Sequence, residues 1–201
     1  MDMKSPKYLV IALVGKAGVG KDTLAQDLVD DHKDWNMIVS CTTRPPREGE
    51  KDGEAYHFLT VEQFTEKVLN GDMLEATCFN GWHYGTAKSA LKPGVNIGVF
   101  NPEGFDCLVE MPIAEVKVLG YYVTCEDKTR LLRQLNREEH PDVNEIIRRW
   151  LADDEDFCEI EDDDRLKPVW NETPFHKMKI QQLIESDIEF AQSPVRIRKF
   201  N

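Results

Sequence analysis

One stretch constrains the fold of this chain more than any other: Gly15-Lys16-Ala17-Gly18-Val19-Gly20-Lys21-Asp22-Thr23. It follows an apolar run over residues 8–14 and opens a segment in which Leu24 and Leu28 recur at helical spacing. A buried strand, a glycine-rich turn, Gly-Lys and a helix, in that order, are the layout of a phosphate-binding loop, or P-loop. A glycine-rich turn can also be simple chain punctuation. The spacing of Gly15, Gly20 and Lys21 behind a strand favours the phosphate-binding interpretation.

The chemistry of this stretch suits the binding of a nucleoside triphosphate. Glycines let backbone N–H groups close around an anion, and the start of the helix adds its positive dipole end. Lys21 supplies a mobile cation for the β- and γ-phosphates. The hydroxyl residue that usually follows this lysine and binds Mg²⁺ is replaced by Asp22, with Thr23 next. The residues predicted to bind ATP and Mg²⁺ here are Gly15, Ala17, Gly18, Val19, Gly20, Lys21, Asp22 and Thr23, with Asp22 as the metal ligand.

Length and composition favour one globular domain without a duplex nucleic-acid or membrane partner. The chain has 201 residues, 41% of them hydrophobic, which is enough to bury a core. A net charge of −12 argues against duplex nucleic acid as a partner. The apolar run near the N-terminus is too short to cross a membrane and lacks a signal-peptide cleavage pattern. The five cysteines show no CxxC spacing, so reduced thiols and a cytoplasmic location are expected.

The hydrophobic pattern predicts strands that alternate with helices. Strands are expected over 7–14, 37–40, 56–59, 73–79, 83–84, 95–100, 116–125 and 167–171. Helices are expected over 22–32, from Thr60 to about Gly71, over 126–140, after the cap Asp142, and from Pro174. Residues 41–53 are expected to form a loop, Asn80-Gly81 a hairpin turn, and the acidic residues 153–164 a solvated helix face and loop. This alternation predicts an α/β fold with a central parallel sheet flanked by helices, interrupted near 41–87 and 127–160.

Three further motifs resemble those of the guanylate kinase family. Residues 40–58 read SCTTRPPREGEKDGEAYHF, residues 73–75 read MLE, and residues 81–86 read GWHYGT. They occur in the family's order and at its distance from the P-loop. The resemblance spans residues 8 to about 190 and is most specific over 40–86.

The resemblance implies a single domain, 1–201, with a P-loop kinase fold. Its core would comprise 1–40, 88–126 and 161–201. An insert that binds the nucleoside monophosphate (NMP) would cover 41–87, and a lid that closes over ATP would cover 127–160. The implied activity is ATP-dependent, Mg²⁺-assisted phosphoryl transfer to an NMP.

Residue chemistry supports an acceptor site in the insert. Arg44 and Arg47 flank a Pro-Pro turn and can hold one phosphate with paired N–H donors, to which tyrosine hydroxyls can add. Glu75 is an acceptor-only carboxylate, suited to the N1–H and exocyclic amine of guanine. Taken one at a time, each of these residues could instead be a solvated surface charge or a tyrosine at the edge of the core. Together, and by resemblance, the predicted substrate-binding residues are Ser40, Arg44, Arg47, Tyr56, Glu75, Tyr84, Gly85, Thr86 and Asn101.

The segment 127–160 supplies candidate cations. Arg133 and Arg137 are four residues apart and are expected on one helical face, with Arg149 on the next capped helix. A solvated stripe that includes Arg130 is the alternative. By resemblance, Arg137 and Arg149 would neutralise the transferring phosphoryl group, whereas Arg133 and Asn171 would lie by the adenine. The predicted catalytic residues are thus Lys21, Arg44, Arg137 and Arg149.

The chain also departs from the family. An Asp-x-Asp-x-Gln-Gly stretch is usual after the middle strand, but residues 99–104 read VFNPEG, so Val99 and Asn101 replace both aspartates. We hypothesise that Asp22 supplies, directly or through water, the carboxylate lost at position 99. The Gly-Lys-Asp-Thr form resembles the phosphate loops of some viral deoxynucleotide kinases.

These observations leave three functions open. The favoured one is an NMP kinase acting on GMP or dGMP as a monomer or homodimer. The first alternative is a kinase for another deoxynucleotide or a modified base. The second is a non-catalytic interaction module, which could dispense with Lys21 and the arginines of 127–160.

Overall fold

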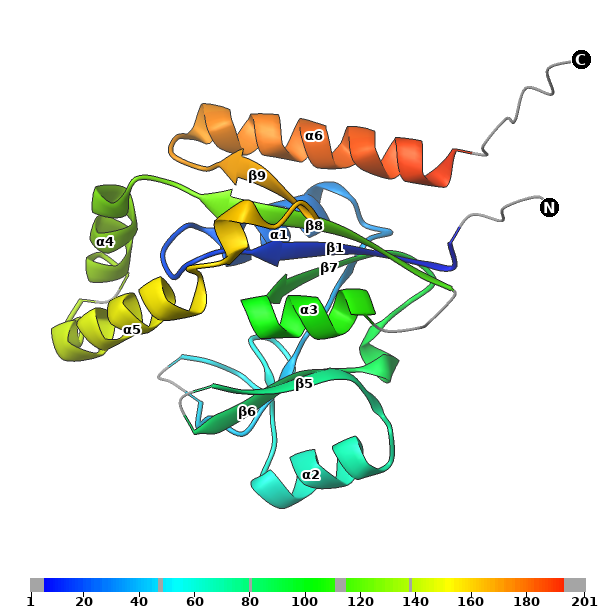
Figure 1. Ribbon diagram of the computed structural model, residues 1–201, viewed down its shortest axis with the longest axis horizontal. Helices are drawn as coiled ribbons and strands as arrows, with labels where there is room; N and C mark the ends of the chain where they lie inside the picture. The colour runs from blue at the N-terminus through cyan, green and yellow to red at the C-terminus, as the bar shows by residue number, and fades with distance from the viewer. Residues whose placement is uncertain (1–5, 47–48, 80, 111–114, 138, 194–201) are drawn as a thin grey trace, which may run out of the picture.

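Alternating strands and helices build a central parallel sheet covered on both faces (Figure 1). The structure is a computed structural model, and it describes residues 6–46, 49–79, 81–110, 115–137 and 139–193. The sheet has the order β2-β7-β1-β8-β9, and all neighbours are parallel. Its strands are β1 (Tyr8–Val14), β2 (Asn36–Met37), β7 (Gly94–Phe100), β8 (Val116–Thr124) and β9 (Leu166–Trp170).

In the described part of the chain, all helices but α2 (Val61–Leu69) lie on the faces of this sheet or beyond the carboxyl ends of its strands, and α2 packs on the insert. The others are α1 (Lys21–Asp31), α3 (Pro102–Glu110), α4 (Asp127–Leu135), α5 (Val143–Asp156) and α6 (Pro174–Gln192), with short 3₁₀ turns η1 (Lys88–Ala90) and η2 (Ile160–Asp162). Figure 1 shows α6 on one side of the sheet and α3 on the other, with α4 and α5 beyond the carboxyl end of β1. The carboxyl ends of parallel strands are where open α/β sheets bind ligands.

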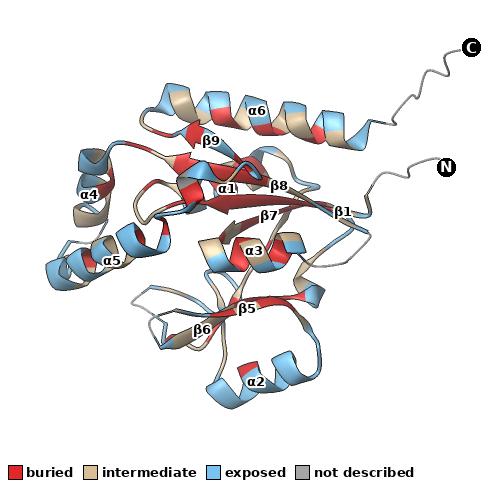
Figure 2. Cartoon of the chain, viewed as in Figure 1, coloured by how far each residue is buried: buried red, intermediate tan, exposed pale blue. Residues whose placement is uncertain are grey.

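The central strand β1 organises the core because both of its faces are buried (Figure 2). Leu9, Ile11 and Leu13 pack in a cluster with residues of α1 and α6. Val10, Ala12 and Val14 pack in a second cluster with Phe105 and Leu108 of α3. A near-continuous apolar run is what a doubly covered parallel strand requires, so the predicted first strand and the α/β class are confirmed.

The insert, residues 41–87, forms a second sheet below α3 in Figure 1. Its order is β4-β3-β6-β5, with strands β3 (Cys41–Thr42), β4 (His57–Phe58), β5 (Met73–Phe79) and β6 (Trp82–Ala87). The helix expected from Thr60 begins with a capping box, in which Thr60 accepts from the Gln63 N–H and the Gln63 side chain accepts from the Thr60 N–H. The β5–β6 pair is antiparallel, as predicted, although Asn80 of its expected turn lies outside the described residues.

Two sequence predictions need correction, and one helix was missed. The strand expected over 37–40 is divided: β2 ends at Met37, and the chain pairs again at Cys41 in the other sheet, because it crosses between sheets there. The helix expected over 126–140 ends at Leu135, so Arg137 lies beyond α4 and does not share a helical face with Arg133. Helix α3 was not predicted, although Asn101 caps it and Pro102 begins it.

One feature of the acidic stretch 153–164 also differs from expectation. Asp153 belongs to α5 and is 8% exposed, so it is not on a solvated face. Within the described ranges, none of the helices combines the length and apolar character that crossing a membrane would need.

Candidate active site

The glycine loop, residues 15–20, joins β1 to α1 at the carboxyl edge of the sheet. Gly18 and Gly20 have φ angles of +83° and +91°, a left-handed conformation that other residues rarely adopt. A Cβ at Gly18 would lie 2.6 Å from the Arg130 carbonyl oxygen, and one at Gly20 would lie 2.8 Å from Asn171 Nδ2. The spacing of glycines recognised in the sequence is therefore required both by backbone conformation and by close packing.

Lys21 begins α1 and folds back onto the loop. Its Nζ donates to the carbonyl oxygens of Gly15, at 2.5 Å, and Lys16, at 3.0 Å. Burial lowers the pKa of Lys21, while the carboxylates of Asp22 and Asp153 act in the opposite direction. A cation poised over a loop of backbone N–H groups is suited to hold phosphate oxygens.

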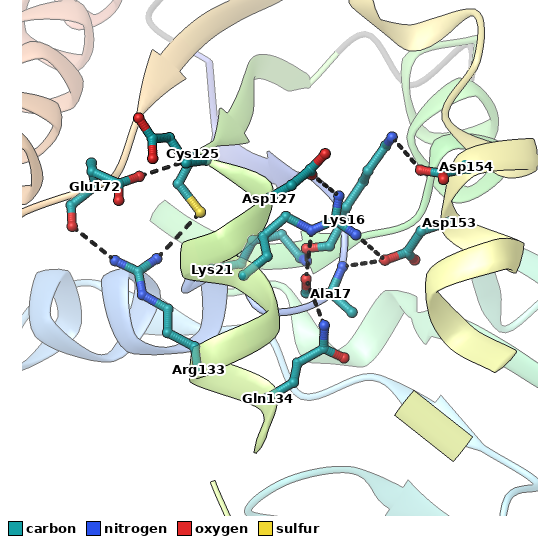
Figure 3. A network of polar contacts seen from close by, with 12 residues as sticks. Lys16, Ala17, Lys21, Cys125, Asp127, Arg133, Gln134, Asp153, Asp154 and Glu172 are labelled. Atoms are coloured by element: carbon teal, nitrogen blue, oxygen red, sulfur yellow. Dashed lines mark hydrogen bonds and ion pairs between the residues drawn. The ribbon is translucent and has the colours of Figure 1, made fainter. Parts of the chain in front are cut away.

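Arg133 and Asn171 hold the second half of the glycine loop. Arg133 Nη1 and Asn171 Nδ2 donate to the Val19 carbonyl oxygen at 3.1 and 2.8 Å. Arg133 also donates to the backbone oxygens of Asn171 and Glu172 and to Cys125 Sγ (Figure 3). Both residues thus lie beside the loop, and in this structure their polar groups bind protein backbone.

In the insert, Arg44 is enclosed by a carboxylate and by aromatic rings. It is 5% exposed, and its Nη2 donates to both carboxylate oxygens of Glu50 at 3.0 and 2.9 Å. Its guanidinium lies 5.4 Å from the ring centre of Tyr56, which in turn meets Tyr84 edge-on at 6.1 Å. Burial raises the pKa of Tyr56 to about 12, with a further contribution from Asp22 of α1, so the insert faces the glycine loop here. Arg47 lies outside the described residues.

Glu75 is the buried acid of the insert. It is 7% exposed, and burial raises its pKa to about 7, although hydrogen bonds from the hydroxyl and N–H of Thr86 act against that rise. The Ser40 and Thr86 hydroxyl oxygens are 3.4 Å apart. A Cβ at Gly85 would lie 2.5 Å from the Glu75 carbonyl oxygen, so β5 and β6 approach closely at this point. The structure therefore brings together the three residues expected to read a base.

Asn101 has a structural task that its sequence position did not indicate. Its Oδ1 accepts from the Gly104 N–H at 2.9 Å and caps α3, while its Nδ2 donates to Thr77 Oγ1 at 3.4 Å. A Cβ at Gly104 would lie 2.7 Å from that Oδ1 and 3.3 Å from Glu75 Oε2. Asn101 thus joins α3 to the strand that carries Glu75.

The arginines of 127–160 are distributed differently from the sequence prediction. Arg130 is 2% exposed and Arg133 is half-buried, so neither belongs to a solvated stripe. Arg137 is exposed beyond α4. Arg149 lies on α5, where its Nε donates to Glu145 at 2.7 Å. The structure thus brings only Arg130 and Arg133 of this set onto the glycine loop.

Sequence reasoning missed four residues that shape the site: Glu50, Gly104, Arg130 and Asp153. Glu50 and Gly104 were inside quoted motifs but had no assigned task. Arg130 and Asp153 pair across 23 residues of sequence, and no local pattern indicates such a pair.

A magnesium ion in this site would depend largely on substrate oxygens. Among the described residues there is no cluster of three or more His, Cys, Asp or Glu side chains able to hold a metal. Asp22 offers one exposed carboxylate in the first turn of α1. Mg²⁺ is commonly held by one or two carboxylates together with phosphates and water, so this donor set fits an ion shared with a nucleotide.

Comparison with known proteins finds the guanylate kinase family by both a family model and individual relatives. The guanylate kinase family model matches residues 7–109, which include the glycine loop and the insert and end before 127–160. A guanylate kinase of Ruegeria sp. (strain TM1040) is 36% identical over 151 residues, covering 70% of this chain and 67% of that protein. One of Prochlorococcus marinus (strain MIT 9312) is 33% identical over 157 residues, covering 74% and 81%. A third, of Nostoc sp., is 43% identical over 89 residues, covering 44% and 45%.

The fold has a counterpart among solved structures. The crystal structure of guanylate kinase from Anaplasma phagocytophilum aligns with a TM-score of 0.66 at 20% identity, covering 96% of this chain and 89% of that one. The α/β fold, the glycine loop and these relatives define an enzyme of the nucleoside monophosphate kinase class. Within that class, the chain belongs to the guanylate kinase family.

Proposed function

We propose that this protein transfers the γ-phosphoryl group of ATP to a guanine nucleoside monophosphate, GMP or dGMP. The observation that carries the proposal is Glu75, a buried carboxylate beside Ser40 and Thr86 with its pKa raised to about 7. A buried acid without a cationic partner is unfavourable for folding. Guanine would compensate this cost, because its N1–H and exocyclic amine are adjacent donors that one carboxylate can accept together.

The same geometry explains why adenine would be a poor acceptor base. Adenine has no donor at N1, so beyond its hydrogen bonds from Thr86 the buried Glu75 carboxylate would keep acceptor sites without a donor. Leaving such a group unpaired costs roughly 1–3 kcal/mol or more. A site built around a hydrogen bond to substrate rejects analogues that lack it more strongly than an apolar pocket does.

The remaining roles follow from charge and position. Arg44, with Tyr56 and Tyr84, would hold the acceptor phosphate, and Arg47 would add a second guanidinium. Lys21 and the glycine loop would hold the ATP phosphates, while Arg137 and Arg149 would approach the transferring group. Mg²⁺, held by Asp22 and the substrate phosphates, would neutralise phosphate charge. The acceptor oxygen can attack the γ-phosphorus in line, so no covalent enzyme intermediate is needed.

Asn101 favours a second candidate, a kinase for another or a modified base. An amide beside Glu75 offers a hydrogen-bond donor as well as an acceptor, whereas an aspartate offers acceptors alone. This change would allow a base that presents an acceptor to the Asn101 Nδ2, which now contacts Thr77. The proposal for guanine takes precedence because Glu75 itself demands donors.

A coupled assay of ADP release across the common ribo- and deoxynucleoside monophosphates tests the proposal. The expected result is a kcat/KM for GMP or dGMP that exceeds the values for AMP, dAMP and the pyrimidine nucleotides. A preference for a pyrimidine or an adenine nucleotide would overturn the assignment. Lys21→Ala, folded by circular dichroism, should show no transfer, because it removes the cation aimed at the β- and γ-phosphates.

We also expect the enzyme to act in the cytosol, as a monomer or homodimer. The five cysteines are free thiols, which suits a reducing compartment. Fractionation of the source cells and light scattering of the purified protein would test these two expectations.

A further inference from the structure

The carboxylate of Asp153 lies against the glycine loop (Figure 3). Its Oδ2 accepts the Ala17 N–H at 2.7 Å, although the two residues are separated by 136 positions in the sequence. Asp153 comes from the last turn of α5 and is 8% exposed. Its neighbour Asp154, which binds Lys16 Nζ at 2.8 Å, is about half exposed. The end of α5 is therefore docked on the loop by one buried carboxylate and one solvated ion pair.

Arg130 of α4 completes this contact. Its Nη2 donates to Asp153 Oδ2 at 3.3 Å, and its Nε donates to the Ala17 carbonyl oxygen at 3.2 Å. Its guanidinium lies 4.0 Å from the ring centre of Trp150 on α5. Both backbone groups of Ala17 are thus bound, the N–H by α5 and the carbonyl by α4.

Burying the Asp153–Arg130 ion pair costs desolvation free energy, which is unfavourable for a contact whose task is stability alone. Burial raises the pKa of Asp153, even though the Ala17 N–H and the charges of Lys21 and Arg130 favour its ionised form. Buried ion pairs commonly contribute no more stability than apolar residues of similar size, because desolvation offsets the attraction between the charges. The pair also fixes the geometry between α5 and the loop.

That geometry bears on Arg149. Glu145, Arg149 and Asp153 are spaced by four residues, so they follow one another along one face of α5. Arg149 stands one turn from Asp153, about 6 Å along the helix axis. Its Nε is bound to Glu145, on the side away from Asp153. Fixing Asp153 on Ala17 therefore fixes how far Arg149 stands from the loop that would hold the ATP phosphates.

We propose that Asp153, clamped by Arg130 and the Ala17 N–H, is a positioning residue that sets the reach of Arg149 toward the transferring phosphoryl group. The inference rests on the proposed phosphoryl transfer and on the role proposed there for Arg149. This role requires no contact between Asp153 and either substrate. It acts through the helix that carries the arginine.

A double-mutant cycle tests this coupling. Arg149→Ala, Asp153→Asn and the double variant are compared with the wild type for kcat and for the KM of ATP and GMP. Asparagine keeps an acceptor for the Ala17 N–H and nearly the same volume, but it loses the charge that Arg130 clamps. Arg149→Ala should lower kcat roughly 100-fold or more, and Asp153→Asn should lower it roughly tenfold with little change in either KM. In the Asp153→Asn background, Arg149→Ala should cost at least about fivefold less than in the wild type.

Asp154→Asn is the matched control, because it alters the adjacent carboxylate on the same helix and leaves the buried contact intact. Its kcat should stay within about twofold of the wild type. Thermal unfolding of each variant separates loss of fold from loss of positioning. If Asp153→Asn unfolds, Arg130→Lys replaces it in the cycle, since lysine keeps the charge but cannot bind Ala17 and Asp153 together.

The outcomes distinguish the inference from the proposed function. Additive effects of the two substitutions on kcat would overturn the positioning role and leave the kinase assignment standing. A rise in kcat or a lower KM for ATP in Asp153→Asn would also overturn it, and would mean that the carboxylate obstructs the loop. A fully active Arg149→Ala would overturn both the inference and the role proposed for that arginine. Absence of transfer by the wild type to any nucleoside monophosphate would overturn the proposed function and the inference with it.

Discussion

The burial of Glu75, the residue proposed to read the base, lowers the stability of the fold at alkaline pH. It remains largely protonated up to about pH 7 in the fold but ionises near pH 4.5 in the unfolded chain. Since one pKa unit corresponds to about 1.4 kcal/mol, ionisation of this buried group at alkaline pH costs the fold on the order of 3 kcal/mol. Stability from this group is therefore greatest below about pH 4.5, falls as the pH rises from 4.5 to 7, and stays reduced above.

Glu75→Gln should separate these effects. At pH 8 we expect the variant to unfold at higher denaturant concentration than the wild type, because the buried charge is gone. Its preference for guanine should shrink, since an amide offers one acceptor and adds donors that face those of guanine. The KM for GMP should rise more steeply in the wild type than in the variant as the pH falls below 7, because protonation of the GMP phosphate at about pH 6 affects both proteins. An unchanged guanine preference, or matching pH profiles, would contradict this account.

The orientation of the Arg44 guanidinium depends on Glu50. The carboxylate, 17% exposed at its side chain, holds the guanidinium with two hydrogen bonds. Glu50→Gln should lower the free energy of unfolding by on the order of 2 kcal/mol. It should also raise the KM for GMP while leaving the KM for ATP unchanged, because the arginine loses its fixed orientation.

Glu54→Gln is the control for this prediction, since Glu54 is 68% exposed and forms a solvated ion pair with Lys51 at 3.4 Å. Steady-state kinetics and urea titrations on both variants provide the measurement. A lower KM for GMP in Glu50→Gln would show that the carboxylate competes with the acceptor phosphate for Arg44.

Among the secondary-structure elements, α3 links the two sheets. One face of it packs on β1, and its first turn borders Glu75 on β5 through Gly104. Asn101 caps the helix and contacts Thr77 on the same strand as Glu75. The position of the buried acid relative to the central sheet is thus set by the start of this helix.

Gly104→Ala should perturb function more than stability. Alanine favours a helix by about 1 kcal/mol over glycine, and displacing the Asn101 cap costs about the same. The added Cβ, 3.3 Å from Glu75 Oε2, should push the carboxylate and raise the KM for GMP roughly tenfold. Glu110→Ala, an exposed change at the other end of α3, is the control. Equal kinetics for wild type and Gly104→Ala would show that the site accommodates the methyl group.

At the scale of the whole molecule, stability resides mainly in the central sheet and its two helical layers. The larger cluster joins β1 to α1 and α6, whereas the described insert contributes a small cluster around Phe64. The insert, residues 41–87, therefore adds little to this core, whereas the 127–160 segment contributes Phe157 and Ile160 to the second cluster. We expect native-state hydrogen exchange to show the slowest amides in β1, β7 and β8.

Two adjacent residues of α6 test this division. Ile184 is fully buried in the larger cluster, and Leu183 is 39% exposed. Ile184→Ala should lower the free energy of unfolding by roughly 2–5 kcal/mol, and Leu183→Ala by less than about 1 kcal/mol. Chemical denaturation measures both values. Similar losses at the two positions would contradict the assignment of α6 to the core.

Local sequence alone determined the glycine loop, the apolar strand before it, the helix caps at Thr60 and Asp142, and the helix start at Pro174. Each depends on residues within a few positions of one another, so the pattern carries the physics directly. The motif residues Ser40, Glu75 and Thr86 were also recognisable, and the structure places them together.

Only the tertiary structure decided which charges are buried and what they bind. The raised pKa of Glu75 arises from packing between β5, β6 and α3, and the docking of Asp153 on Ala17 joins segments far apart in the sequence. Desolvation and pairing depend on the full set of neighbours around a group. The sequence therefore cannot tell an acidic residue on a solvated face from one that is buried in an ion pair. Only the fold showed that Asp153 is buried and bound to Arg130 and Ala17.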